Sequence, residues 1–168
     1  MRSIVLAASL VTFAALAGGC CTTPPPPDKF FDRTTATETL KGFVYSVDIG
    51  NWDYAYASLT QASRREMSSL KFRIVIQYLK DPVFGTVPIY DLISESVRSR
   101  TPEVERNGRR LITVLPTVRD SSGNLATMEL PLVFLEEEGE VRLDFLETLE
   151  KLQHLRDTSP PPTALSTR

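Results

Sequence analysis

Residues 103–145 read EVERNGRRLITVLPTVRDSSGNLATMELPLVFLEEEGEVRLDF, and this stretch decides the fold. Asn107-Gly108 predicts a tight hairpin, because both residues tolerate the positive φ angles that the turn requires. Ser121-Ser122-Gly123-Asn124 and Glu137-Glu138-Gly139 predict two further turns. Over residues 128–135, between the last two turns, every second residue is large and apolar, which is typical of a strand with one buried face. Three hairpins in succession therefore predict an antiparallel meander.

One residue of this strand, Pro131, interrupts the pattern. Proline has no backbone N–H to donate to a sheet, so we expect Pro131 at a bulge or on an edge position. Breaks of this kind fit a strongly curved sheet, because a bulge bends the strand that carries it.

The residues before the meander have the spacing of helices. Thr35-Ala36-Thr37-Glu38 matches a capping box and predicts a helix that Gly50 ends. Asn51 predicts the cap of a second, short helix. Ser63-Arg64-Arg65-Glu66 has the capping-box spacing too, and it predicts a third helix closed by Asp81-Pro82. The side chains that this third helix is expected to turn toward the core are Met67, Leu70, Ile74, Val75 and Tyr78.

Residues 83–100 fit a short helix in part, while their later portion is also compatible with a strand, and both readings stay open. The order of the remaining elements is clear, with helices first and a meander afterwards. It predicts an α+β domain in which N-terminal helices pack on one face of a curved antiparallel sheet.

Three segments carry a resemblance to a known superfamily: LKGFV at 40–44, GNWDYAY at 50–56 and LVFLEEEGEVRL at 132–143. Together they resemble the nuclear-transport-factor-like superfamily (cystatin-like, SnoaL and ketosteroid-isomerase), and in particular its small bacterial lipoprotein and lumazine-binding-like members. The resemblance covers residues 34 to 150. It implies a cone-shaped, cystatin-like domain with a pocket between the curved sheet and the first helix. It does not imply an activity, because a fold does not determine function.

Residues 1–19 have the composition of a signal peptide: a positive start, an apolar run over 4–17 and a patch of small residues. The run is shorter than the about 20 apolar residues that a membrane-spanning helix needs. The segment LAGGC at 16–20 resembles the lipobox of bacterial lipoproteins, which implies that Cys20 is acylated and becomes the mature N-terminus. The alternative is cleavage after Ala17 and secretion of a soluble protein.

Both cysteines of the chain, Cys20 and Cys21, lie at this junction, so the body of the chain has no disulfide and no thiolate metal site. Cys21 stands where an Asp would favour the inner membrane, and we therefore predict an exported protein anchored on the periplasmic side of the outer membrane. The predicted organisation is a signal peptide at 1–19, a lipidated cysteine with a Pro-rich linker at 20–33, the nuclear-transport-factor-like domain at 34–155, and a disordered Ser/Thr/Pro tail at 156–168.

Few residues have the character of catalytic groups. His154, the one histidine, follows the last strand in a charged segment, so no zinc site is expected. Asp91 and Glu95 fit the exposed side of a helix, or the mouth of a pocket if residues 87–97 line one. We expect no catalytic residue, no metal and no cofactor.

Charged turns give little more. Arg106, Arg109 and Arg110 form a basic turn and residues 136–138 an acidic one, and both are interpreted as solvated. The formal net charge of −2 and the lack of a basic patch interleaved with aromatics exclude nucleic acid as a partner. Tyr56 and Tyr78, on predicted inward stripes, are the candidates for ligand binding, because a phenol can hydrogen-bond a ligand carbonyl; a core tyrosine with a satisfied hydroxyl is the alternative.

These observations predict a non-catalytic, lipid-anchored envelope protein whose domain binds a small apolar ligand or a protein partner. Two alternatives remain: a SnoaL-like isomerase or dehydratase that uses a Tyr/Asp pair in the cone, and a structural module that forms a homodimer through the sheet.

Overall fold

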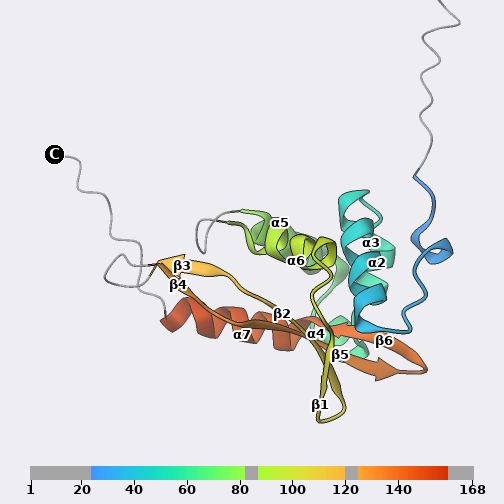
Figure 1. The fold of residues 1–168 in the computed structure, drawn as a ribbon. Coiled ribbons are helices and arrows are strands. Elements are labelled where there is room, and N and C mark those ends of the chain that lie inside the picture. The colour runs from blue at the N-terminus through green and yellow to red at the C-terminus, as the bar shows by residue number, and fades with distance from the viewer. Residues whose placement is uncertain (1–23, 82–86, 120–124, 159–168) are drawn as a thin grey trace, which may run out of the picture.

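The computed structural model describes residues 24–81, 87–119 and 125–158 (Figure 1). The predicted signal peptide, Cys20 and the turn at 121–124 lie outside these residues. The helical elements are η1 (Pro27–Lys29), α2 (Ala36–Asp48), α3 (Trp52–Ala57), α4 (Gln61–Glu66), α5 (Ser69–Lys80), α6 (Ile89–Arg98) and α7 (Phe145–Thr158). The strands are β1 (Val104–Arg106), β2 (Arg109–Val114), β3 (Thr117–Arg119), β4 (Leu125–Thr127), β5 (Leu130–Glu137) and β6 (Glu140–Asp144).

The predicted meander is confirmed as an open antiparallel sheet with the strand order β1-β2-β5-β6. Asn107 and Gly108 turn between β1 and β2 with φ angles of 55° and 71°. Glu138 and Gly139 turn between β5 and β6 with φ angles of 56° and 79°. The short strands β3 and β4 pair with each other in a separate two-stranded sheet, which extends the hairpin between β2 and β5.

Pro131 occupies an edge position, as expected. It lies opposite Thr113 of β2, whereas the pairing of β5 with β6 begins only at Val133, opposite Asp144. The first residues of β5 therefore extend past the end of β6. No ladder hydrogen bond toward β6 is required of Pro131 there, which explains why a proline is tolerated in an otherwise central strand.

Helix α2 packs on one face of the sheet and supplies much of the core (Figure 1). Thr35 caps it, because the Thr35 hydroxyl accepts from the N–H of Glu38 at 3.1 Å. Between α2, α5 and the start of α7, the rings of Phe43, Phe72 and Phe145 lie with their centroids 5.6–6.3 Å apart. The fold class is α+β, with helices on an antiparallel sheet, as predicted.

The prediction for the third helix is wrong in two respects. The chain forms two helices here, α4 capped by Thr60 and α5 capped by Ser68, separated by an extended Met67. The residues of α5 that face the core are Phe72, Ile76 and Leu79, whereas Leu70, Ile74 and Tyr78 lie on its exposed side. α5 carries apolar residues on two faces, so periodicity alone could not show which face is buried. The buried face is the one that packs against the rings of Trp52, Phe43 and Phe145.

Two boundaries differ from the expectation. Within the predicted linker, Pro27 is buried, the Tyr45 hydroxyl donates to Pro25 O at 3.1 Å and the Tyr54 hydroxyl donates to Phe31 O at 3.2 Å. This part of the linker therefore packs on α2 and α3. At the other end, α7 continues to Thr158, past the predicted domain end, and the rest of the tail lies outside the described residues. The ambiguous residues 83–100 include helix α6, and residues 82–86 are not described.

Candidate functional site

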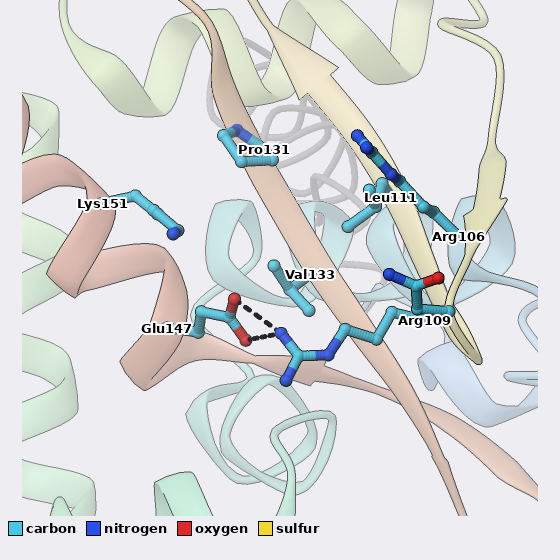
Figure 2. Close-up of a pocket in the computed structure, with 8 residues that line it drawn as sticks. Arg106, Arg109, Leu111, Pro131, Val133, Glu147 and Lys151 are labelled. Atoms are coloured by element: carbon cyan, nitrogen blue, oxygen red, sulfur yellow. Dashed lines mark hydrogen bonds and ion pairs between the residues drawn. The ribbon is translucent and has the colours of Figure 1, made fainter.

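A shallow groove with a volume of about 250 Å³ lies between the β1–β2 hairpin and α7 (Figure 2). It is on the face of the sheet opposite α2, because side chains alternate between faces along a strand and Ile112 and Leu132 point toward α2. The residues that line this sheet groove are Arg106, Asn107, Arg109, Leu111, Pro131, Val133, Glu147 and Lys151.

The floor of the sheet groove is apolar. Leu111 of β2 and Val133 of β5 lie directly opposite each other in the strand register, and Pro131 is next to them on the same face. Val133 is buried although it is not part of the main core cluster. An apolar surface of this kind favours contact with hydrocarbon or an aromatic ring.

The rim of the sheet groove is charged, mostly with positive sign. Arg109 Nη1 lies 2.7 Å from Glu147 Oε1 and 2.6 Å from Oε2, and this ion pair connects the hairpin to α7 (Figure 2). Arg106 and Lys151 form no ion pair within the described part of the chain. The rim thus has three cations and one carboxylate, and the excess positive charge attracts an anion.

Helix α7 is held in place by polar contacts at its first turn. The N–H groups of Phe145 and Leu146 donate to Ser63 Oγ at 3.0 and 3.2 Å, and the N–H of Glu147 donates to Asp144 Oδ1 at 3.2 Å. Glu147 and Lys151 are four residues apart, so they lie on the same side of the helix. The cap therefore sets which side chains of α7 form the second wall of the sheet groove.

The two tyrosines predicted as ligand-binding candidates are not part of the sheet groove. The hydroxyl of Tyr56 lies 2.9 Å from Arg64 O and 2.7 Å from Met67 O, and its ring is 5.8 Å from that of Phe72. Tyr56 therefore connects α3 to the junction of α4 and α5. This is the alternative that the sequence left open for it, a core tyrosine whose hydroxyl is satisfied within the protein. Tyr78 lies on the exposed side of α5, so the expectation that it faces the interior is wrong.

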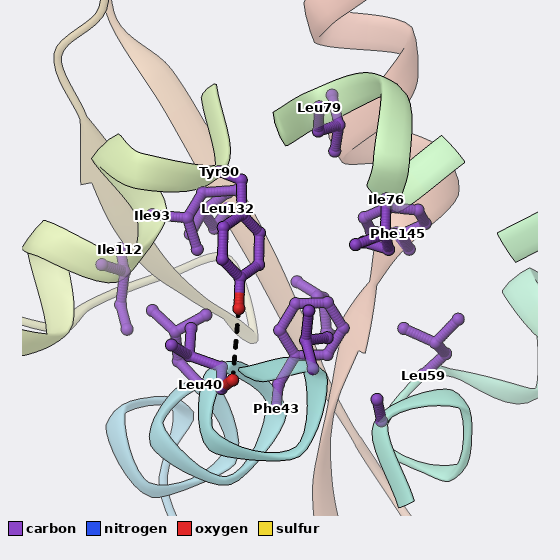
Figure 3. Packing of buried hydrophobic residues seen from close by; sticks show 14 of the residues in the cluster. Leu40, Phe43, Leu59, Ile76, Leu79, Tyr90, Ile93, Ile112, Leu132 and Phe145 are labelled. Atoms are coloured by element: carbon purple, nitrogen blue, oxygen red, sulfur yellow. Dashed lines mark hydrogen bonds between the residues drawn. The ribbon is translucent and has the colours of Figure 1, made fainter. Parts of the chain in front are cut away.

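The interior between α2 and the sheet is filled by apolar side chains (Figure 3). Leu40 and Phe43 of α2 are buried against Ile112, Leu132 and Phe134 of the sheet. The resemblance implies an open pocket in this position. The ring of Tyr90 is part of the filling, which leaves the interior side chains in contact with each other.

Tyr90 also provides a polar contact that the sequence did not indicate. Its hydroxyl lies 2.8 Å from Asp48 Oδ1 and 3.2 Å from Val44 O, which joins α6 to the end of α2. Burial, followed by the hydrogen bond to Asp48, raises the pKa of Tyr90 above its ordinary range. The phenol therefore stays protonated and acts as a structural donor.

A second hollow, of about 410 Å³, lies along the exposed side of α6. Asp91 and Glu95 line it, as the sequence left open, and both are exposed. Glu95 is 3.6 Å from Arg98. The arrangement resembles an ordinary solvated helix surface.

Other chemistry is sparse in the described residues. His154 lies exposed on α7, and among the described residues no three His, Cys, Asp or Glu side chains come together as a metal site. None of the helices in the described ranges has the length and apolar character needed to cross a bilayer. Comparison of the chain with family models, curated proteins and solved structures gave no match.

The charged residues of the sheet groove come from two segments that nothing local in the sequence connects, a basic turn interpreted as solvated and the charged segment that contains His154. Arg106 and Arg109 belong to the basic turn, and Glu147 and Lys151 to the charged segment after the last strand. About forty residues separate the two segments, and only the return of α7 alongside β5 brings them together. The signal that could have found them is the opposite sign of Arg109 and Glu147 on elements that flank one apolar strand pair.

Proposed function

We propose that this chain is an exported protein that a lipid on Cys20 anchors at the periplasmic side of a bacterial outer membrane, and that its domain binds a small apolar ligand with an acidic group. The binding part rests on the sheet groove. Leu111 and Pro131, both partly exposed, offer an apolar floor, while Arg106 and Lys151 are cations without an ion pair in the described chain. An apolar body would lie on the floor and its carboxylate would meet one of the two cations, which lie on opposite sides of the sheet groove (Figure 2).

The size of the sheet groove limits the ligand. Its volume of about 250 Å³ is just below the range of about 300–1,000 Å³ that is usual for ligand sites. The ligand is therefore smaller than a drug-sized molecule, and a medium-chain fatty acid has the required chemistry. Because the groove is open to solvent, we expect weak and reversible binding.

A binding role is favoured over the enzymatic alternative for two reasons. The space between α2 and the sheet, in which a Tyr/Asp pair would have to act, is filled by apolar side chains. The carboxylate that lines the sheet groove, Glu147, is engaged in an ion pair in which Arg109 Nη1 contacts both of its oxygens. A general base must instead be free to accept a proton from a substrate.

The assignment of the α+β domain to the nuclear-transport-factor-like fold is also part of the proposal. A first helix capped by Thr35, the short helix α3 capped by Asn51 and the closing hairpin at Glu138-Gly139 are the elements that the nuclear-transport-factor-like resemblance rests on. We propose that the sheet has the strong curvature of a cone-shaped, cystatin-like domain. An experimental structure tests this directly, and a flat sheet would contradict it.

The anchor is tested by expression of the native chain and of Cys20→Ser, with Cys21 kept, in a bacterial host. The expected result is that the native chain partitions with membranes and carries acyl mass, and that Cys20→Ser loses both. If both chains are soluble and cut after Ala17, the anchor is wrong and the protein is secreted.

The ligand is tested by calorimetric titration of the purified full chain with decanoate and, for comparison, with decanol. Decanoate is expected to bind more tightly, because only it carries the charge that the cations recognise. The double substitution Arg106→Gln with Lys151→Gln should weaken decanoate binding by about tenfold or more, since hydrogen bonds to charged groups contribute about 1.5–3 kcal/mol. Arg98→Gln with Arg100→Gln removes two exposed cations elsewhere and is the matched control.

Equal binding of decanol, or an unchanged affinity in the Arg106/Lys151 variant, contradicts the proposed ligand class. If neither compound binds, a protein partner or a homodimer through the sheet replaces the small ligand as the leading hypothesis. A molecular mass that rises with protein concentration would then indicate the homodimer, and a constant mass would indicate a different protein partner.

A further inference from the structure

Helix α5 carries apolar side chains on two opposite faces. Phe72, Ile76 and Leu79 face the core. On the other side, Leu70 is 68% exposed, Ile74 is 62% exposed and Tyr78 is 42% exposed. These three residues are four positions apart, so they follow one stripe along the helix surface. We call Leu70, Ile74 and Tyr78 the outer stripe of α5. A contiguous exposed apolar surface of this kind marks a contact site.

The charged residues of α5 are all basic. Lys71 and Arg73 lie on the two sides of the outer stripe, Lys80 is in the last turn, and the helix contains no Asp or Glu. The whole chain carries a formal net charge of −2, so α5 concentrates positive charge on one surface. An apolar stripe between Lys and Arg side chains is typical of helices that lie in the interface of a membrane with anionic lipids.

Two of these cations are held against the domain by aromatic rings. The guanidinium of Arg73 lies 5.6 Å from the ring centre of Trp52, and Lys80 Nζ lies 4.5 Å from that of Tyr90. Such contacts restrict the cations to the surface of the domain, where their outward N–H groups can still meet a phosphate.

The N-terminal segment brings the predicted anchor close to the same part of the domain. Four residues lead from Cys20 to Pro24, and at about 3.5 Å per residue they span at most ~14 Å. Beyond them the segment is fixed to the helices, because Tyr45 donates to Pro25 O and Tyr54 donates to Phe31 O. An anchor at Cys20 therefore keeps the helices within a short distance of the lipid surface.

The point where this segment attaches is connected to α5 through α3. Tyr54 and Trp52 both belong to α3, and the ring of Trp52 lies 6.4 Å from that of Phe72 in α5. In Figure 1 the segment leaves on the helix side of the sheet, the side on which α5 and α6 lie, and away from the β1–β2 hairpin. The tether and the outer stripe are thus on the same side of the sheet.

We propose that the outer stripe of α5 docks on the membrane that holds the Cys20 anchor, with Lys71 and Arg73 against anionic lipid headgroups. The inference rests on the anchor in the proposed function, because one short amphipathic helix binds a bilayer only weakly and a second signal makes the attachment stable. Docking has a consequence for the ligand. The sheet groove lies on the face opposite α2, so it points away from the membrane and stays open to the periplasm.

The test uses the acylated full chain with Cys21→Ser and one new thiol, Ile74→Cys, which carries an environment-sensitive fluorophore. The chain is reconstituted in vesicles of phosphatidylglycerol and phosphatidylethanolamine that contain a lipid-attached quencher, and separately in vesicles of phosphatidylcholine. Glu105→Cys, an exposed position on β1, is the matched label. Because both positions are exposed, the labelled chains are expected to unfold at the same temperature as the parent.

The expected result is strong quenching at position 74 in the anionic vesicles, weak quenching there in phosphatidylcholine, and little at position 105 in either. Lys71→Gln and Arg73→Gln should each lower the ratio of docked to undocked chains by about fivefold, the equivalent of ~1 kcal/mol for one basic residue near an anionic surface.

Acyl mass and flotation with the vesicles report the anchor separately from the docking. A chain that floats with the vesicles but is not quenched at position 74 overturns the docking and leaves the anchor standing. A chain without acyl mass contradicts the anchor and the docking that depends on it. A label at position 74 whose emission changes with protein concentration in the absence of vesicles shows that a second copy covers the stripe, which also overturns the proposal.

Discussion

The hydroxyl of Ser63 accepts hydrogen bonds from the backbone N–H of Phe145, at 3.0 Å, and of Leu146, at 3.2 Å. The first bond joins residues 82 positions apart. The N–H groups at the start of a helix have no partner inside it, and Ser63 is fully buried, so water cannot replace its oxygen. Because α7 presents Glu147 to the sheet groove, this contact between α4 and α7 positions one wall of the candidate site.

Ser63→Ala is expected to lower the free energy of unfolding by about 1–3 kcal/mol, since it leaves buried N–H donors unsatisfied. Denaturant unfolding followed by circular dichroism measures the change. The control is Ser69→Ala, at an exposed position on α5. A loss no larger in Ser63→Ala than in the control would mean that Asp144 alone caps α7.

Phe72→Ala and Leu70→Ala distinguish the two faces of α5. Phe72 is fully buried, and its ring contacts Phe43, Trp52 and Phe145. Its removal is expected to cost about 3–5 kcal/mol, because it leaves a cavity in the core. Leu70→Ala should change stability by less than ~0.5 kcal/mol, the usual size for a surface substitution. If thermal or denaturant unfolding showed a larger loss of stability for Leu70→Ala than for Phe72→Ala, the face of α5 predicted from the sequence would be the buried one.

Stability is expected to fall at high pH in part through Tyr90. The pKa of Tyr90 in the folded state is above the unfolded value of about 10, so its contribution is complete below pH ~10 and is lost as the pH rises beyond it. Tyr90→Phe removes the hydrogen bond to Asp48 and should cost about 1–2 kcal/mol at neutral pH. Stability curves measured from pH 7 to alkaline pH are expected to converge for the two proteins. Parallel curves would show that Tyr90 does not cause the dependence.

Gly42→Val should release the N-terminal segment from α2. A Cβ at Gly42 would lie 3.1 Å from Phe31 Cβ and 3.2 Å from the Tyr54 hydroxyl, closer than ordinary contact. The segment that contains Lys29 would then be displaced, and limited trypsin digestion is expected to cut there faster than in the parent. Thr37→Val, another β-branched residue on the same helix, is the control. Equal cleavage rates in the two variants would argue that the segment adjusts without detaching.

The candidate site was less predictable than the fold. The turn residues Asn107 and Gly108 indicated a hairpin because their backbone angles are a local property. The ion pair between Arg109 and Glu147 is a long-range contact, and in the sequence its two residues belong to separate charged segments. Tyr78 illustrates the same limit, since its place on an apolar stripe was correct but that stripe is the exposed one.

What the sequence determined by itself is local: the caps at Thr35 and Asn51, the tight turns, and the alternation of the strands, which together lead to an α+β domain. The tertiary structure decided which apolar face of α5 is buried, where the chain after β6 returns, and hence that a hairpin and α7 enclose the sheet groove. The physical reason is that caps and turns depend on the conformations of neighbouring residues, whereas the choice between two apolar faces depends on the surfaces that distant segments offer.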